Sequence, residues 1–479
     1  MLEPIVRKHL PRLQRVYDRF PAPARHVLTS ARGWVLTHLR YSSSTFDQLR
    51  SLRTQDFLPR DEQQILQLRA LQSAVNHALC TTPFYAAYPR VSIRAPEDLR
   101  QLPVLDRATA LENAERLLSH DVALHRRILA STTGTTGTSL RVAYTEEVVR
   151  TNWAFLLRQW SWAGIEPRAP RVTLQGARIV PPRRTRPPFW THNILERQIL
   201  VSIFHLSEAA APAYLKFLSR QRGKVLEGFP SVLGILADFV VAAGEPIPMR
   251  AVFTSGESLV APTRAKIQRA FHAPVFDTYG MTEYCGLIQQ CESGGMHLAC
   301  EYGFLEILDA RGNACPPGED GDFVWTGFIN PAMPLVRYRI GDRGCWQAGA
   351  CPCGRSSPLV TPTITRESDI LRLAGGRVFS PRALNQLLKN SSALRFCQFV
   401  ARSPESVAIR AVPGCAGALD ELMAIRAELQ RLLGPLVRVT AELAAEPITR
   451  TGGKVPLIVN AFSPATSATP AQPTVAEMN

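Results

Sequence analysis

A loop rich in hydroxyl groups constrains this chain more than any other stretch. Seven of the nine residues from Ser131 to Ser139 carry hydroxyls and the other two are glycine. Apolar residues precede the loop, and Val142–Tyr144 after it has the composition of a strand. Because glycine adopts positive φ at little cost, the backbone N–H groups can turn inward and, with the hydroxyls, surround an anion such as a triphosphate. The Gly-Lys-Ser/Thr ending of a Walker A loop is missing, and a polar loop without a ligand is the alternative interpretation of this stretch alone.

The length and composition predict a globular protein of several domains. A chain of 479 residues exceeds the size at which a single core stops growing, so we expect two or more domains. Hydrophobic residues make up 46% and charged residues 20%, which is typical of soluble proteins. No apolar run approaches the roughly 20 residues of a membrane span, and residues 1–19 lack the pattern of a secretory signal. We therefore expect a cytoplasmic protein without a membrane partner.

The net charge of +15 comes mostly from arginine. Such a charge can indicate nucleic acid, a membrane surface or polyanionic substrates. The arginines are scattered and form no nucleic-acid-binding motif, so we expect no nucleic-acid partner. The densest basic stretch, Arg168 to Arg186, is interleaved with proline and is interpreted as a solvated loop.

Hydrophobic periodicity predicts alternating helices and strands. Asp106 is a candidate N-cap for a helix through Leu117. Further helices are predicted at residues 61–80, 146–162, 212–222 and 230–243. Short strands are predicted at residues 171–174, 251–254, 275–277, 304–308 and 323–325. This alternation favours an α/β fold of layered sheets.

The last hundred residues have the pattern of a separate, small α+β domain. A hairpin is predicted around Gly375-Gly376, then a helix at 381–389, a strand at 407–412, a helix at 420–433 and a strand at 437–443. The predicted domains are an N-terminal helical extension at 1–60, a core domain at 61–365, a C-terminal domain at 366–462 and a disordered tail at 463–479.

Five short motifs, in the same order, resemble those of adenylate-forming enzymes. They are Thr132-Thr133-Gly134-Thr135-Thr136-Gly137, Asp277-Thr278-Tyr279-Gly280-Met281-Thr282-Glu283, Tyr338-Arg339-Ile340-Gly341-Asp342, Arg366-Glu367-Ser368-Asp369 and Thr451-Gly452-Gly453-Lys454. Leu102–Leu105, Cys353–Arg355 and Gly376–Pro381 resemble the phenylacetate–CoA ligase branch, particularly its CapK-like members. The sequence departs from the common pattern at three positions. In the hinge motif, Thr365 stands where the family has glycine and Ser368 where it often has aspartate. Ser255 stands where many relatives have a second glycine.

The resemblance implies a large N-terminal domain with a small mobile C-terminal lid. It also implies that a carboxylic acid attacks the α-phosphorus of ATP to give an acyl-adenylate, and that the thiol of coenzyme A then displaces AMP. A planar, aryl acid is one option. The alternative is transfer to an amine, a sugar or a carrier protein in polysaccharide or secondary-metabolite biosynthesis. A degenerate, non-catalytic nucleotide-binding protein is a further class, which the intact loop, Asp342 and Lys454 argue against.

The resemblance also implies roles for individual residues. The loop residues Thr132, Thr133, Gly134, Thr135, Thr136 and Gly137 would hold the β- and γ-phosphates. Glu283 would hold Mg²⁺, Thr282 would contact the α-phosphate, and Lys454 would reach the α-phosphate and the carboxylate. Asp342 would accept the ribose hydroxyls, with Arg366 near the ribose or a phosphate. The adenine site would be lined by Ser255, Gly256 and Glu257, with the Asp277-Thr278-Tyr279-Gly280 segment beside it and Tyr279 stacked on the base.

A second site is predicted from cysteine spacing. Cys291 with His297 and Cys351 with Cys353 supply three sulfurs and one imidazole, and zinc takes four such ligands in a closed tetrahedron. The ion would be structural, as the resemblance also implies. Four buried side chains without a metal are the alternative, and Cys285, Cys300 or Cys345 could replace a member of the set.

Overall fold

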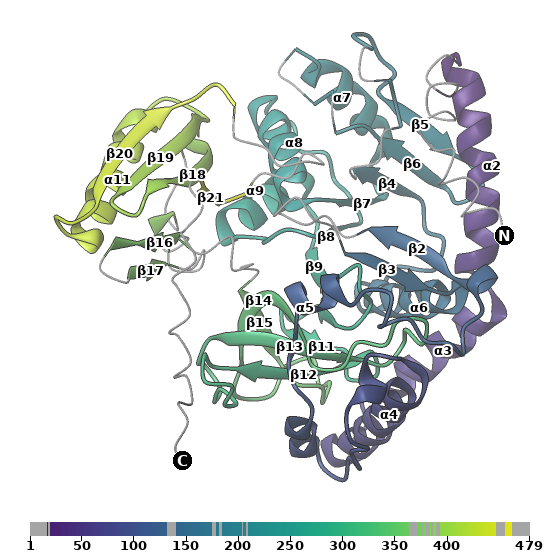
Figure 1. Ribbon diagram of the computed structural model, residues 1–479. Coiled ribbons are helices and arrows are strands. Elements are labelled where there is room, and N and C mark those ends of the chain that lie inside the picture. The colour runs from purple at the N-terminus through teal and green to yellow at the C-terminus, as the bar shows by residue number, and fades with distance from the viewer. Residues whose placement is uncertain are drawn as a thin grey trace. The chain divides into compact units, whose positions relative to one another are not determined.

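The chain divides into two compact units. The computed structural model describes Tyr17 and residues 20–131, 140–174, 179–181, 184–203, 205–206, 209–363, 371–374, 377–379, 384, 387–388, 393–446 and 456–461. The larger unit comprises Met1–Glu367 with Thr449–Val455, and the smaller one comprises Ser368–Ile448 with Pro456–Asn479. Figure 1 shows the elements of both units.

The described helices of the larger unit begin where their sequences supply starting signals. Ser42 caps one helix, because its hydroxyl accepts a hydrogen bond from the Thr45 amide at 3.3 Å. Another helix has Asp61 and Glu62 in its first turn, where acidic side chains favour the helix dipole. The helices are α2 (Ala22–Arg40), α3 (Ser43–Gln55), α4 (Arg60–Thr81), α5 (Arg107–Glu112), α6 (Glu146–Trp162), α7 (Ala211–Leu218), α8 (Pro230–Ala242) and α9 (Ala261–Phe271).

An eight-stranded sheet forms the centre of the larger unit (Figure 1). Its order is β11-β10-β9-β8-β7-β4-β6-β5, and the five inner strands from β9 to β6 run parallel. The strands are β4 (Arg171–Leu174), β5 (Trp190–Asn193), β6 (Gln198–Val201), β7 (Val225–Gly228), β8 (Ala251–Ser255), β9 (Val275–Gly280), β10 (Leu287–Gln290) and β11 (Met296–Leu298).

Helices cover both faces of this sheet, as the strand sequences require. Successive strand side chains point to opposite faces. Leu226 and Val252 therefore pack against α7, α8 and α9, whereas Val225, Ala251 and Phe253 pack against α3 and α6. Both sets are buried, so the parallel strands are apolar on both faces.

A second sheet of five strands packs with α4 around another hydrophobic core of the larger unit. Its order is β1-β14-β13-β12, with β15 paired to β14. The parallel pairing of β1 with β14 places Leu105 opposite Tyr338 and Asp106 opposite Arg339. The strands are β1 (Leu105–Asp106), β12 (Gly303–Leu308), β13 (Gly321–Gly327), β14 (Tyr338–Trp346) and β15 (Val360–Thr363).

The smaller unit is built on a four-stranded sheet of order β20-β19-β18-β21. Helix α11 (Ala418–Leu433) buries Leu422, Ile425 and Leu429 in the core of this unit. The predicted hairpin is present, because β16 pairs antiparallel with β17. The strands are β16 (Leu371–Leu373), β17 (Arg377–Phe379), β18 (Leu394–Ser403), β19 (Ser406–Pro413), β20 (Arg438–Leu443) and β21 (Ile458–Asn460).

Two predicted helices were wrong in length. Asp106 does cap α5, with its carboxylate accepting from the Thr109 amide at 2.8 Å, but the helix ends at Glu112 rather than Leu117. Asn113 leaves the helical region there, with φ −110° and ψ 20°. The helix predicted at 212–222 is α7, which ends at Leu218 and continues as a 3₁₀ turn over Ser219–Gln221. Most of the helix predicted at 381–389 lies outside the described residues.

Candidate active site and metal centre

The hydroxyl-rich loop connects two paired strands. Strand β2 (Ile128–Ser131) runs antiparallel to β3 (Arg141–Tyr144), and Ser131 lies opposite Arg141. The pairing therefore fixes the two ends of the loop side by side, as an anion-binding loop of this kind requires. The loop residues Thr132, Thr133, Gly134, Thr135, Thr136 and Gly137 lie outside the described residues, as do Arg366 and Lys454.

The carboxyl ends of β8 and β9 bring two of the predicted nucleotide segments together. These neighbouring parallel strands place Ser255 opposite Thr278. Gly256 directly after β8 has φ +78°, a conformation that favours glycine, and Glu257 follows it. Ligands of open α/β sheets bind outside the carboxyl ends of the strands. The two segments therefore lie at the edge of the sheet where a ligand is expected.

Asp277 is a buried acid within β9. The Thr254 hydroxyl donates to its Oδ1 at 2.6 Å, and the backbone N–H of Asp277 donates to Gln290 Oε1 at 3.1 Å. Burial raises the pKa of Asp277 to about 6, although the Thr254 hydrogen bond and the Arg264 charge act in the other direction. The Asp277 side chain lies in the protein interior, and its hydrogen bonds hold strand β9 in place.

Helix α6 fixes the strand that carries the Tyr-Gly-Met-Thr-Glu segment. The Gln159 amide donates to the Asp277 carbonyl oxygen at 2.8 Å and to the Gln290 carbonyl oxygen at 3.2 Å. Its oxygen accepts from the Thr278 hydroxyl at 2.6 Å. Gln159 is buried, so these bonds lie away from water. No sequence pattern points to Gln159 beyond its place in a predicted helix.

Two tyrosine–carboxylate pairs join the motif on β9 to the motif on β14. The hydroxyl of Tyr279, from the first motif, donates to Asp342 Oδ2 of the second at 2.8 Å. The hydroxyl of Tyr338, from the second motif, donates to Glu283 Oε1 of the first at 3.4 Å. The exposed fraction is 6% for Asp342 and 3% for Glu283. Motifs far apart in the sequence therefore hold each other's carboxylates in place.

Tyr279 is placed differently from the predicted stacking position. The residue is 3% exposed, and its ring packs against Trp325 and edge-on against Phe323. Burial, with the Asp342 carboxylate beside it, raises the pKa of Tyr279 well above its ordinary value. Its hydroxyl stays protonated and donates to Asp342, whereas the predicted stacking on an adenine base needs an exposed ring face. The described arrangement does not support that stacking.

Arg107 is a candidate site residue that lies outside the five motifs. It is the first residue of α5, and its Nη1 lies 3.7 Å from Glu283 Oε1. The pairing of β1 with β14 brings it there, since Leu105 and Asp106 sit opposite the start of the second motif. The signal available in the sequence was the Leu-Pro-Val-Leu-Asp-Arg stretch, but it does not show that the arginine faces Glu283. Thr282, beside that acid, is exposed.

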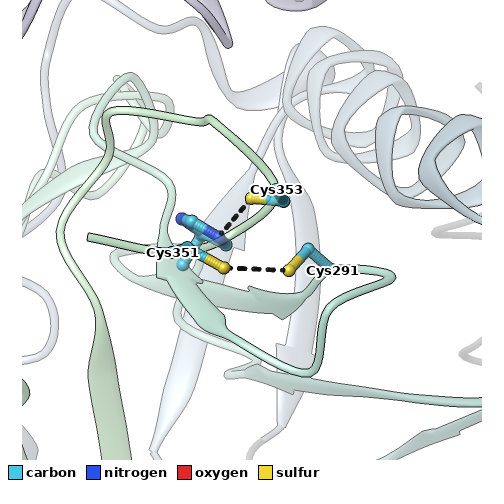
Figure 2. A group of neighbouring side chains, drawn as sticks. Cys291, Cys351 and Cys353 are labelled. Carbon is cyan, nitrogen blue, oxygen red and sulfur yellow. Dashed lines mark hydrogen bonds between the residues drawn. The ribbon is translucent and has the colours of Figure 1, made fainter. Parts of the chain in front are cut away.

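The four predicted metal ligands converge at one point, as Figure 2 shows for the three labelled cysteines. The ligand atoms of Cys291, His297, Cys351 and Cys353 all lie within 4.8 Å of one another. Cys291 Sγ lies 3.6 Å from Cys351 Sγ, and Cys353 Sγ lies 3.3 Å from His297 Nε2. Cys285, Cys300 and Cys345 do not belong to this group.

The surroundings of the cluster suit a metal ion. His297 Nδ1 lies 3.1 Å from the Ser357 carbonyl oxygen and can donate a hydrogen bond to it. The other ring nitrogen, Nε2, then has a lone pair with which it can bind a metal ion. Burial lowers the pKa of His297 to about 4, so the ring is neutral near pH 7. Gly295 allows the close approach of the ligands, because a Cβ there would lie 2.7 Å from Cys351 Sγ. Three thiols and one imidazole are a donor set typical of structural zinc.

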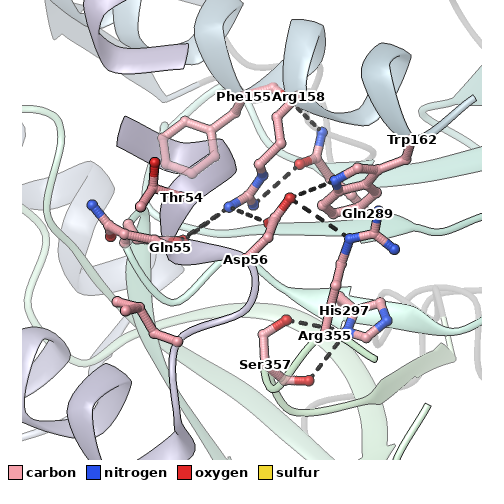
Figure 3. A network of polar contacts seen from close by, with 12 residues as sticks. Thr54, Gln55, Asp56, Phe155, Arg158, Trp162, Gln289, His297, Arg355 and Ser357 are labelled. Atoms are coloured by element: carbon pink, nitrogen blue, oxygen red, sulfur yellow. Dashed lines mark hydrogen bonds and ion pairs between the residues drawn. The ribbon is translucent and has the colours of Figure 1, made fainter. Parts of the chain in front are cut away.

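A buried ionic network surrounds Asp56 next to this cluster (Figure 3). The Trp162 indole donates to Asp56 Oδ2 at 2.7 Å, and the guanidinium groups of Arg158 and Arg355 each lie 3.6 Å from this carboxylate. Arg355 also lies with its guanidinium 4.4 Å from the Trp162 ring centroid. Asp56 is the C-cap of α3, so the network ties the N-terminal helices to the loop that carries Cys351 and Cys353.

Known proteins resemble this chain in sequence and in fold. No protein-family profile matches it. Protein CapK of Staphylococcus aureus is 23% identical over 338 residues, which cover 69% of this chain and 72% of CapK. A phenylacetate–coenzyme A ligase of Thermus thermophilus is 24% identical over 362 residues, covering 72% of this chain and 79% of the ligase.

Solved structures of known proteins share the fold of this chain. A 2-hydroxyisobutyryl-CoA ligase in its postadenylation state superposes with a TM-score of 0.66 at 19% identity, covering 85% of this chain and 91% of the ligase. The chain therefore has the fold of adenylate-forming CoA ligases. In sequence, the chain is similar to CapK and to phenylacetate–CoA ligases.

Proposed function

We propose that this chain activates a carboxylic acid with ATP and transfers the acyl group to coenzyme A. The observation that carries the proposal is the reciprocal pairing of Tyr279 with Asp342 and of Tyr338 with Glu283. These bonds hold the two acids that the superfamily motifs assign to the nucleotide within one buried region of the larger unit. The matches to phenylacetate–CoA ligases support the choice of an acid–thiol ligase.

Two displacements make up the proposed reaction. In the first, a carboxylate oxygen of the acid bonds to the α-phosphorus of ATP, and pyrophosphate leaves with the electron pair of the broken P–O bond. In the second, the sulfur of coenzyme A bonds to the acyl carbon, and AMP leaves as its phosphate takes the electrons of the acyl–oxygen bond. The thiol proton passes to solvent or to AMP. Charge stabilisation around the α-phosphorus is the main contribution expected from the protein.

The proposed residue roles follow the motifs. Asp342 would accept the ribose hydroxyls, for which an ionised carboxylate is well suited. The loop at 132–137 would hold the outer phosphates, and Ser255–Glu257 would line the adenine site. Lys454 and Thr282 would contact the α-phosphate, and Arg366 the ribose or a phosphate. Tyr279 and Asp277 become positioning residues in this proposal, because both side chains are buried in the fold.

Glu283 fits a role in holding Mg²⁺. Magnesium in nucleotide sites is held by one or two carboxylates together with substrate phosphates, and Glu283 is a buried carboxylate in the motif to which the resemblance assigns this role. The bound ion would neutralise charge on the phosphates. The Arg107 guanidinium 3.7 Å from Glu283 gives the acid a positive partner before the ion arrives. Arg107 would then be released from this ion pair and could contact a phosphate.

A structural zinc ion at Cys291, His297, Cys351 and Cys353 is the second part of the proposal. The convergence of the four ligand atoms within 4.8 Å supports it. The ion would hold the 351–357 segment against β10 and β11 and take no part in the reaction. A cytoplasmic location completes the proposal.

Pyrophosphate–ATP exchange with a panel of carboxylic acids tests the proposal. Exchange that depends on one acid is expected for an adenylating enzyme and identifies its substrate. Release of AMP should then require coenzyme A. Release that instead requires an amine, a sugar or a carrier protein would replace coenzyme A by that acceptor. Absence of ATP binding by the purified chain would overturn the proposal.

A further inference from the structure

Helix α2 presents apolar side chains to solvent. A surface helix normally buries its apolar stripe and exposes its polar face. In α2 this arrangement is reversed, since Val27 is 68% exposed and Trp34 is 56% exposed. Residues 27, 31, 34, 35 and 38 recur at helical spacing, so they share one side of the helix. The exposed large apolar residues on and just before the helix are Phe20, Val27, Leu28, Trp34 and Val35.

The opposite side of α2 is fixed to the sheet by polar contacts. His26 Nδ1 accepts from the His192 amide at 3.1 Å, and the Ser30 hydroxyl donates to the His192 carbonyl oxygen at 3.3 Å. Gly33 lies directly against Asn193, because a Cβ at Gly33 would come within 1.9 Å of Asn193 Oδ1. The helix is therefore held in one orientation, with its apolar side turned outward.

The turn between β5 and β6 extends this apolar surface. The Ile194 amide donates to the Ser30 hydroxyl at 3.2 Å, which places the turn beside the middle of α2. Ile194 is 72% exposed and Leu195 is 42% exposed. Seven of the seventeen exposed large apolar side chains in the described part of the chain belong to this surface, which we call the α2 patch. Apolar patches of this kind mark interaction sites.

The charge around the α2 patch is positive. Helix α2 contains no acidic residue, and of its three arginines Arg32 is exposed, whereas Arg25 is buried and Arg40 is paired with Glu196. Arg168 donates to the Leu195 carbonyl oxygen at 3.1 Å, so its guanidinium lies against the turn. Glu196, the acid in this turn, is fully buried and paired with Arg171 and Arg40.

We propose that the α2 patch docks this protein on an anionic membrane surface. Apolar and tryptophan side chains insert at the level of the lipid headgroups, and arginines are attracted to anionic lipids. A second copy of the chain fits less well, because it would bring two positive surfaces together. The sequence-based expectation of no membrane partner rested on the lack of a spanning run. No described helix is long and apolar enough to cross a bilayer, and surface docking needs none.

Cosedimentation with lipid vesicles tests this proposal on the full chain. The wild-type protein should bind phosphatidylcholine vesicles that contain phosphatidylglycerol, and binding should weaken as salt is added. Vesicles of phosphatidylcholine alone should bind it about tenfold less. The double variant Val27→Glu/Trp34→Glu should lose at least about tenfold in binding to the anionic vesicles, because two inserted side chains become charged. Arg32→Gln should lose less than this double variant.

A matched control uses exposed apolar residues elsewhere. Leu419 and Met423 of α11 are 57% and 45% exposed, and Leu419→Glu/Met423→Glu should bind the vesicles like the wild type. Both double variants should keep their unfolding midpoints and their pyrophosphate exchange, so failure of the proposed function would not affect the result. Equal binding to neutral vesicles, or unchanged binding of the α2 variant, would overturn the proposal. A wild-type dimer that Val27→Glu/Trp34→Glu converts to a monomer, without vesicle binding, would assign the patch to self-association instead.

Discussion

The two candidate centres of the larger unit differ in how their polar groups are satisfied. At the nucleotide motifs, Asp342 receives a hydrogen bond from Tyr279, and Glu283 has Arg107 and Tyr338 beside it. At the cysteine cluster, four ligand atoms converge mainly on one another. Carboxylates with protein partners can exchange those partners for a substrate that comes and goes. Four converging donors instead favour an ion that stays. The nucleotide motifs therefore suit a catalytic role, and the cysteine cluster suits a structural role.

The largest expected effect is that of Asp342→Asn, which should impair the reaction without changing the stability of the fold. Asp342→Asn should lower kcat/KM for acid-dependent pyrophosphate exchange by about 1000-fold, because two charge-assisted hydrogen bonds to the ribose are each worth about 2 kcal/mol. The variant should unfold close to the wild-type midpoint, since the new amide oxygen can still accept from Tyr279. Exchange kinetics and thermal unfolding measure the two effects.

Asp322→Asn is the matched control for that variant. Asp322 lies on the neighbouring strand β13 and pairs with Arg343 at 2.7 Å, but it belongs to no motif. Its exchange rate should stay within about twofold of the wild type, as expected for a partly exposed ion pair. Equal losses in the two variants would show that Asp342 acts through the fold alone.

Removing the proposed zinc ion should instead cost stability. Cys351→Ser should lower bound zinc and reduce the free energy of unfolding by at least about 3 kcal/mol, because metal binding contributes directly to folding. At temperatures where the variant stays folded, pyrophosphate exchange should remain. Metal analysis and urea unfolding make the measurement, with Cys300→Ser as a buried cysteine outside the cluster that should keep the metal. If the wild-type protein contained no zinc and were as stable as expected of the zinc-bound form, the cysteine cluster would not be a structural zinc site.

The pH dependence of stability should report the burial of Asp277. Its pKa is raised from 3.8 to about 6 in the folded chain, so the folded state favours the protonated form. This contribution is full below about pH 4 and is lost as pH rises through about 6, a change of about 3 kcal/mol. Asp277→Asn cannot titrate, so the stability of the wild type relative to this variant should fall over that range. Parallel pH profiles in urea unfolding would contradict the assignment.

The smallest expected effect concerns the reciprocal tyrosine pairs. Tyr279→Phe should lower exchange about tenfold, since a hydrogen bond to a carboxylate is worth about 1.5 kcal/mol. Tyr338→Phe should have a smaller effect, because its bond to Glu283 is longer, at 3.4 Å. Tyr214→Phe removes a buried hydrogen bond to the Ser202 carbonyl oxygen, and should reduce stability without changing exchange. Unchanged exchange in both motif variants would mean that the pairs do not position the acids.

Local patterns predicted part of this fold well. Helix α6 spans Glu146–Trp162 as predicted. Strand β4 and the β16–β17 hairpin were also predicted from local signals. Helix α5 was predicted too long, since hydrophobic residues continue to Leu117 in a folded turn after Asn113. Periodicity does not distinguish a short helix followed by buried turns from one longer helix.

The candidate site was predictable where a motif names the residue and not where only the fold places it. Cys291, His297, Cys351 and Cys353 converge as their spacing indicated. Arg107 reaches Glu283 only through the pairing of β1 with β14, a contact between segments distant in sequence. Gln159 and Asp56 act through similar long-range contacts. Motifs carry chemistry that recurs among proteins, whereas these partners depend on strand order and helix packing.

Identification of the nucleotide product tests the central claim most directly. The chain is incubated with ATP labelled at the α-phosphate and the acid selected by exchange, before and after addition of coenzyme A. The account predicts an acyl-adenylate before the addition, and AMP with the acyl thioester after it. ADP as the labelled product, or AMP formed equally well without any acid, would contradict it.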